Sequence, residues 1–336
     1  MFIKQGIKPD NPFWKYVVGF VVIIMATFIG NLPFGIAVAV KGMMDGGKIP
    51  TAPNELMTML DANLTLFLMM LAFVFTLGAT FLMVRYLHGQ TIREVTTGRK
   101  KTDWGRIFFS FGLWSIFTIV FTAIAYFGSP QDFEINFNLG RFLILVVVAV
   151  LMVPIQTSAE EYLFRGYLMQ GFAVLVRNKW FPLLTTSVIF GLMHIMNPEV
   201  EKIGYIAMVY YIGTGLFLGI LTLMDDGMEL ALGFHASNNL IGALLITADW
   251  SAFQTDSILK DLSEPTVGFD ILFPVVVIFP ILLFIFSKKY GWPNWKERLT
   301  GTIEMPADGF QTLANDTHTN EIPENNDNAY RNPDLP

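Results

Sequence analysis

The sequence contains no cysteine among its 336 residues. That absence excludes a disulfide framework, a thiolate metal site and a cysteine nucleophile. Charge is also scarce, since Asp, Glu, Lys and Arg make up 15% of the chain and hydrophobic residues 53%. We find no glycine-rich phosphate loop, no nucleic-acid-binding motif and no clear internal repeat, so we expect no nucleic acid among the partners.

Much of the chain consists of long apolar runs. A bilayer core needs about 20 apolar helical residues to cross it, and about eight segments approach that length. The sequence therefore predicts an all-α fold, a polytopic transmembrane helix bundle surrounded by lipid. The predicted spans are Phe13–Val40, Leu64–Val84, Ile107–Phe127, Phe142–Gln156, Phe181–Ile195, Ile203–Met224, Leu230–Ile246 and Phe269–Phe286. The fourth stays compatible with one long helix to about Val176, interrupted only by Pro154.

The distribution of Lys and Arg predicts the orientation. If the N-terminus is cytoplasmic, most basic residues fall in cytoplasmic loops, as the positive-inside rule requires. We therefore expect both termini in the cytoplasm of a multi-pass protein of the bacterial cytoplasmic membrane. The first apolar run follows a hydrophilic start and is too long for a signal peptide, so we expect it to remain as an anchor.

Two segments stand out by their charge. Residues 85–106 are the most basic part of the chain, which favours a surface lying on anionic lipid, with substrate docking as the alternative. Residues 299–336 carry much of the negative charge and no long apolar run, so they predict a disordered cytoplasmic tail. The remainder, residues 1–298, is expected to form one transmembrane domain, with a motif core at 139–245.

Few ionisable side chains lie within the apolar runs, where each costs about 2.5 to 3.5 kcal/mol to insert. The chain has four histidines. His88 lies in the basic segment and His318 in the tail, so both are expected to be solvated and without a role. His194 and His235 lie inside apolar helices and remain as candidates.

The stretch "TSAEEYLFRGYLMQ", residues 157–170, places three charges in an apolar helix. Glu161 and Arg165 are four residues apart, so they can share one helical face and neutralise each other. Glu160 is rotated by about 100° from Glu161 and cannot use Arg165 in the same way. Glu160 therefore needs another partner.

The candidate partners come from two later helices. His235 and Asn239 are four residues apart and project from one face, with Ser237 and Asn238 turned away. If the helices pack together, Glu160, His194, His235 and Asn239 meet in one cavity, an inventory that suits activation of water, directly or through a shared divalent metal. Each residue also has a structural reading, as an interhelical hydrogen bond or an ion pair.

Three motifs in order resemble the CPBP family of intramembrane proteases, which includes the type II CAAX prenyl endopeptidases. They are "EEYLFR" from Glu160, "FGLMH" ending at His194 and "HASNN" from His235. The resemblance covers about residues 139–245 and implies an intramembrane endopeptidase that cleaves peptides or proteins, lipidated or membrane-bound, near the cytoplasmic face.

The resemblance also implies roles for the motif residues. Glu160 and His194 would activate water, and His235 and Asn239 would stabilise the oxyanion. Glu161 and Arg165 would orient the site or bind a substrate carboxylate. A divalent metal, zinc first, would be held by Glu160, His194 and His235. A metal-independent glutamate mechanism is the alternative.

Two further readings and one geometric difficulty stay open at this stage. A proton-coupled transporter would also place Glu and His in a helix bundle, and a non-catalytic scaffold or immunity protein could keep the same fold. The difficulty is depth: His194 lies about 20 Å along a helix that is predicted to start near Trp180, whereas Glu160 is expected in the cytoplasmic half of its own helix.

Overall fold

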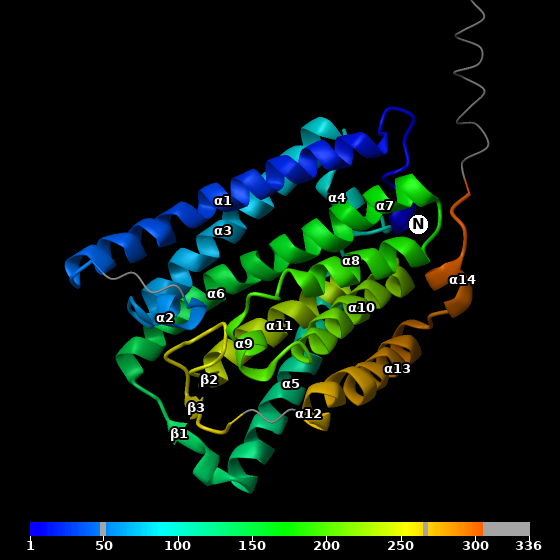
Figure 1. Cartoon of the computed structure of the whole chain (residues 1–336). Helices are drawn as coiled ribbons and strands as arrows, with labels where there is room; N and C mark the ends of the chain where they lie inside the picture. Colours follow the sequence, from blue (N-terminus) through cyan, green and yellow to red (C-terminus); the bar gives the residue numbers. More distant parts are fainter. Residues whose placement is uncertain (48–51, 265–267, 305–336) are drawn as a thin grey trace, which may run out of the picture. The chain divides into compact units, whose positions relative to one another are not determined.

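Helices make up most of the computed structural model, which describes residues 1–47, 52–264 and 268–304, apart from the side chains of residues 53, 54, 269 and 270 (Figure 1). Six helices in the described residues are long and apolar enough to cross a membrane. They are Phe13–Met44, Ala62–Leu87, Trp104–Gly128, Leu139–Val176, Ala207–Asp225 and Ile271–Tyr290. The prediction of an all-α polytopic bundle is confirmed.

The helices and strands follow one another in a simple order. In chain order the α-helices are α1 (Phe13–Met44), α2 (Pro53–Thr58), α3 (Ala62–Leu82), α4 (Ile92–Thr96), α5 (Trp104–Gly128), α6 (Leu139–Glu161), α7 (Met169–Val176), α8 (Trp180–Leu192), α9 (Pro198–Ile203), α10 (Ala207–Asp225), α11 (Glu229–Leu245), α12 (Phe269–Phe273), α13 (Phe279–Tyr290) and α14 (Trp295–Thr300). Short 3₁₀ turns lie at Phe2–Lys4 and Pro130–Asp132, and π-helical turns at Met83–Leu87, Tyr162–Leu168 and Pro274–Ile278.

Two of the predicted spans correspond to shorter helices. α8 has 13 residues and α11 has 17, less than the roughly 20 that a bilayer core requires. Most residues of α11 are buried, because it packs against both α5 and α6 inside the bundle. A helix enclosed by other helices does not have to match the lipid thickness by itself.

Local sequence signals set where several helices begin. The Asp61 side chain accepts hydrogen bonds from the N–H groups of Asn63 and Leu64 and so caps α3. Asp103 caps α5 in the same way, and Asn138 caps α6. Each cap satisfies N–H groups that the first turn of a helix leaves without a partner. The start of α6 is therefore set by the neighbouring residue Asn138. This helix leads into the first motif.

The direction of the helices defines two ends of the bundle. At the terminal end, the N–H of Phe2 donates to Asp226 Oδ1 at 2.6 Å, and the N–H of Ile303 to the carbonyl oxygen of Arg177 at 2.8 Å. At the other end, β1 (Phe133–Ile135), β3 (Leu259–Asp261) and β2 (Ile246–Ala248) form a small sheet in that order. We call it the sheet end. Figure 1 shows the N-terminus and the strands on opposite sides of the view.

The sheet was not predicted from the sequence. β3 lies in the middle, antiparallel to β1 and parallel to β2, with Leu259 opposite both Ile135 and Ile246. Three-residue strands give too short an alternation of polar and apolar residues to be recognised by pattern. Their pairing joins the segment after α5 to the segment after α11.

The predicted long helix is present. Residues Leu139–Val176 continue through Pro154, with a π-helical turn at Tyr162–Leu168 directly after Glu161. Such turns are rare and concentrate at functional sites, because they re-aim the side chains around them. Here the turn carries Arg165.

The basic segment is only partly a surface feature. Arg99 pairs with Asp225 at 3.0 Å and with Glu229 at 3.1 Å, and Arg106 also pairs with Asp225. Both carboxylates are buried, so these arginines bind the acidic turn between α10 and α11. The prediction that the whole segment lies on lipid is wrong for these two residues. Lys101 is exposed.

The prediction for His88 is also wrong. Its side chain is 3% exposed, with Nδ1 at 2.6 Å from Asn11 Oδ1 and Nε2 at 2.8 Å from the Tyr167 hydroxyl. Burial, with a smaller contribution from Lys15, lowers the pKa of His88 to about 4. The ring joins the N-terminal segment to the long helix. His318 lies outside the described residues.

The folded unit continues past the predicted boundary at residue 298. Met1–Ile303 form one compact unit, and Ile303 is buried among residues of the N-terminal segment and α7. A bridge between Asn178 and Thr302 holds this last segment to the loop before α8. Most of the predicted disordered tail, residues 305–336, lies outside the described residues.

Candidate active site

The first motif forms a buried ion pair. Glu161 is fully buried and accepts a hydrogen bond from Arg165 Nη1 at 2.8 Å, as the four-residue spacing predicts. Arg165 Nη2 donates to the carbonyl oxygen of Gly215 in α10 at 3.1 Å, and the guanidinium lies 4.5 Å from the centre of the Phe190 ring. The arginine therefore connects the long helix to α8 and α10.

Glu161 has a second partner that the sequence analysis missed. His235 Nδ1 lies 2.7 Å from the same Oε1 atom that Arg165 contacts. Because a carboxylate only accepts, Nδ1 carries the proton, and His235 turns Nε2 toward Glu160 Oε2 at 3.4 Å. The expectation that Glu161 and Arg165 account for each other alone is therefore incomplete, since Glu161 also orients His235.

Gln156 is a site residue that was not predicted. Its Nε2 donates to Glu160 Oε1 at 2.6 Å, and its Oε1 accepts a hydrogen bond from Asn239 Nδ2 at 3.0 Å. One amide thus joins the candidate base to the candidate oxyanion donor. The available signal was an amide four residues before Glu160, on the same helical face of an apolar run.

His194 reaches the site because α8 ends inside the bundle. The helix stops at Leu192, and His194 lies in the turn that follows, with Nδ1 donating to the carbonyl oxygen of Phe190 at 2.8 Å. This bond leaves Nε2 as the basic nitrogen. The ring stacks on Tyr211 at 4.4 Å between centroids. The depth difficulty disappears, because the long helix continues to Val176 and places Glu160 about 24 Å from that end, close to the depth of His194.

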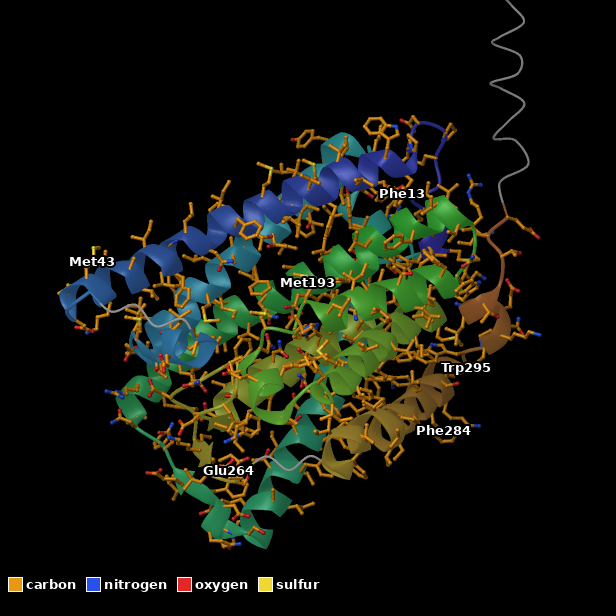
Figure 2. All side chains as sticks on the ribbon, in the orientation of Figure 1. Phe13, Met43, Met193, Glu264, Phe284 and Trp295 are labelled. Atoms are coloured by element: carbon orange, nitrogen blue, oxygen red, sulfur yellow. The ribbon has the colours of Figure 1, made fainter. Side chains whose placement is uncertain are left out.

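A cavity of about 540 Å³ brings three of the six candidates together, a size typical of ligand pockets. Its polar lining includes Gln156, Glu160, His194 and Asn239. Apolar residues form much of the rest, among them Met57, Met69, Met70, Phe73 and Met193. Met193, which is labelled near the centre of the view in Figure 2, lines the cavity with an exposed side chain.

The other three candidates do not line this cavity. Glu161, Arg165 and His235 lie behind Glu160, where they are buried. Asn238, expected to turn away, does line the cavity; it donates to Asn239 Oδ1 at 3.0 Å and accepts from Trp114 Nε1 at 3.1 Å.

The predicted metal ligands do not form a ligand set in this structure. Across residues 1–47, 52–264 and 268–304, no three His, Asp or Glu side chains are arranged so that they could hold a metal ion. His235 Nδ1 is held by Glu161 and His194 Nδ1 by a carbonyl oxygen, which leaves the Nε2 atoms as the only ring nitrogens that could bind a metal. Glu160, His194 and His235 would have to rearrange to share one ion.

Comparison with known proteins identifies one family. The model of the family described as type II CAAX prenyl endopeptidase Rce1-like matches residues 138–241, which contain all three motifs. The uncharacterized protein YyaK of Bacillus subtilis (strain 168) is 30% identical over 253 residues, covering 75% of this chain and 84% of the relative. No solved structure matches the chain.

Proposed function

Because this chain belongs to the type II CAAX prenyl endopeptidase Rce1-like family, we propose that it is an intramembrane endopeptidase. Its substrate would be a membrane-associated peptide or protein, and Glu160 would activate the water that cleaves it. The observation that supports this proposal best is the state of that carboxylate. Glu160 faces the cavity, and its Oε2 accepts no hydrogen bond from any described residue. An ionisable group this deep in an apolar bundle marks a functional site by default.

The contacts around Glu160 suit a general base. Gln156 fixes one oxygen, and the other faces His235 Nε2 at 3.4 Å. Since His235 Nδ1 already donates to Glu161, a neutral ring would direct a lone pair at Glu160. The carboxylate and the imidazole nitrogen are therefore close enough to exchange a proton. Such a pair can take up a proton from water and release it again.

The reaction is proposed to begin with water between Glu160 and His194. Glu160 accepts a proton from the water while the water oxygen attacks the carbonyl carbon of the peptide, and His194 Nε2 orients the water. Asn239 has two amide hydrogens and gives one to Gln156, so the other can donate to the developing oxyanion. The C–N bond breaks as its nitrogen accepts the proton from Glu160.

The buried residues are assigned positioning roles. His235 lies behind Glu160, so we assign it to proton exchange with Glu160 rather than to the oxyanion. Arg165 is fully buried and outside the cavity lining, so we assign Glu161 and Arg165 to orienting His235 rather than to binding a substrate carboxylate. A metal requirement stays a prediction, tested by comparing cleavage with and without a chelator and by metal analysis of the purified protein.

The entry side is proposed from the lining of the cavity. Met57 of α2, Thr247 of β2 and Trp250 of the turn after β2 line it near the sheet end. The sequence predicts both termini and the cleavage at the cytoplasmic face, but the cavity extends from Glu160 toward the end opposite the termini. We therefore propose that the peptide enters from the sheet end.

The absence of native cysteine makes the entry side testable. Lys101→Cys reports the terminal end and Glu134→Cys, in β1, the sheet end, since both residues are exposed. A membrane-impermeant maleimide applied to intact cells should label the variant whose residue lies outside the cell. Labelling of Lys101→Cys alone would contradict cytoplasmic termini.

The activity is tested with purified protein in liposomes and a library of membrane-associated peptides, with products identified by mass spectrometry. We expect cleavage by the wild type and none by Glu160→Gln. Glu264→Gln is the matched control, because that carboxylate is 82% exposed and pairs only with Lys202 among the described residues. Equal cleavage by Glu160→Gln would refute the proposal. No cleavage by the wild type would favour the scaffold or transporter reading.

A further inference from the structure

A second carboxylate faces the cavity away from Glu160. Glu199 in α9 accepts a hydrogen bond from the N–H of Ala252 at 2.6 Å through Oε1. Its Oε2 is buried and meets the geometric criteria for a hydrogen bond with no described residue, although the Tyr211 hydroxyl interacts with the carboxyl. The indole N–H of Trp250, in the same lining, is also buried without an acceptor in the described part of the chain.

These unsatisfied atoms are unusual. Buried polar groups in folded proteins almost always have a hydrogen-bond partner, so the Glu199 oxygen suits a donor group of a ligand and the Trp250 N–H suits an acceptor such as a peptide carbonyl. The motifs of the family do not include Glu199 or Trp250, and the proposed reaction at Glu160 uses neither.

No described Lys or Arg side chain pairs with Glu199. Lys202, in the same helix, pairs with Glu264 at 2.6 Å instead, and no described Lys or Arg lies within ion-pair distance of Glu199. Burial raises the pKa of Glu199, which means that the ionised form lacks sufficient stabilisation where it stands. A cation brought into the cavity would supply it.

The surrounding side chains suit a cation. The rings of Tyr210, Tyr211 and Trp250 line the same cavity, and Asp261 adds a second carboxylate to the lining. Ammonium and guanidinium groups bind best where a carboxylate and aromatic faces are combined in a partly desolvated site. The rest of the lining is largely apolar and would accept uncharged side chains.

We propose that Glu199 is a specificity subsite that binds a lysine or arginine side chain of the peptide whose scissile bond lies at Glu160. The inference rests on the proposed peptidase function, because it treats the cavity as the peptide site. Membrane peptides are mostly apolar, so one basic residue at a fixed distance from the scissile bond would select a substrate sharply.

Binding is measured first, without cleavage, in the Glu160→Gln protein. The probes are fluorescent octapeptides of leucine and alanine that carry one lysine, moved through each position, and matched peptides with uncharged norleucine in its place. We expect lysine to improve the dissociation constant about tenfold at one or two positions. Adding Glu199→Gln, which keeps an acceptor for the N–H of Ala252, should abolish that preference, and adding Glu201→Gln, an exposed carboxylate of the same helix, should retain it.

The outcomes separate this inference from the proposed function. Equal binding of lysine and norleucine peptides would overturn the subsite. So would a preference that survives Glu199→Gln, or a loss of thermal stability in Glu199→Gln with the preference unchanged, since Glu199 would then be structural. A lysine preference without any cleavage by the protein that retains Glu160 would support the cation subsite and refute the peptidase proposal.

Discussion

Removing the charge of Arg165 should destabilise the protein more than removing any surface charge. Arg165 and Glu161 have side chains 1% and 0% exposed, and among the described residues only His235 also lies within ion-pair distance of Glu161. In Arg165→Met the apolar stem is kept and a buried carboxylate loses its guanidinium. Breaking a buried pair in this way costs about 3 to 5 kcal/mol.

The loss is measured as a change in melting temperature. For a protein of this size, about 2 °C per kcal/mol converts the expected loss into roughly 6 to 10 °C. The seven tryptophans allow unfolding to be followed by intrinsic fluorescence in detergent. Lys41→Met is the matched control, because Lys41 and Asp45 form an exposed pair, 43% and 51% exposed, which is worth at most about 1 kcal/mol.

A double variant decides whether the charge itself is the cause. In the double variant Arg165→Met with Glu161→Gln, an uncharged amide replaces the buried carboxylate. The double variant should therefore melt at a higher temperature than Arg165→Met alone. The reasoning is refuted if Arg165→Met melts within 2 °C of the Lys41→Met control, or if the two losses simply add.

Three further outcomes are expected. Gln156→Leu should lower kcat about 10-fold to 100-fold while the melting temperature changes little, because one hydrogen bond to the Glu160 carboxylate and one to the Asn239 amide are lost; an unchanged kcat would remove Gln156 from the site. Gly233→Ala should destabilise the protein by about 1 to 3 kcal/mol, because a Cβ there would lie 2.1 Å from a main-chain carbonyl oxygen of α5. Gly112→Ala is the control, since Gly112 has open space around it and the change should not destabilise the protein. Equal melting temperatures of the two variants would contradict the close packing of α5 and α11. The pKa of His88 is about 4 in the folded protein, against an ordinary value of 6.5. Between these pH values the unfolded chain binds more protons than the folded one, so the stability should fall as the pH is lowered from 6.5 toward 4. If the melting temperature of His88→Gln falls equally over this range, another group is responsible.

The contacts of the site that could be predicted are those between residues about one helical turn apart in the sequence. The ion pair of Glu161 with Arg165 follows from a spacing of four residues, and the shared face of His235 and Asn239 from the same spacing. The start of α6 follows from the cap at Asn138. Each depends only on the geometry of the α-helix, so no other part of the chain is needed.

The contacts between helices could not be read in this way. His235 and Glu161 are separated by 74 residues, and Asn239 and Gln156 by 83. Their meeting depends on how α6 and α11 pack, which a single sequence with two isolated motifs does not specify. The mistaken view of His88 has the same origin, since its partners Asn11 and Tyr167 are 77 and 79 residues away.

The amino-acid sequence by itself determined that the chain is a helical membrane protein and which helices carry ionisable groups, because hydropathy and helical periodicity are local properties. Only the tertiary structure decided which of those groups face the cavity. Burial places Arg165, Glu161 and His235 behind Glu160, and the end of α8 inside the bundle brings His194 beside it. The same packing left Glu199 in the cavity lining with an open oxygen, which no spacing in the sequence could have indicated.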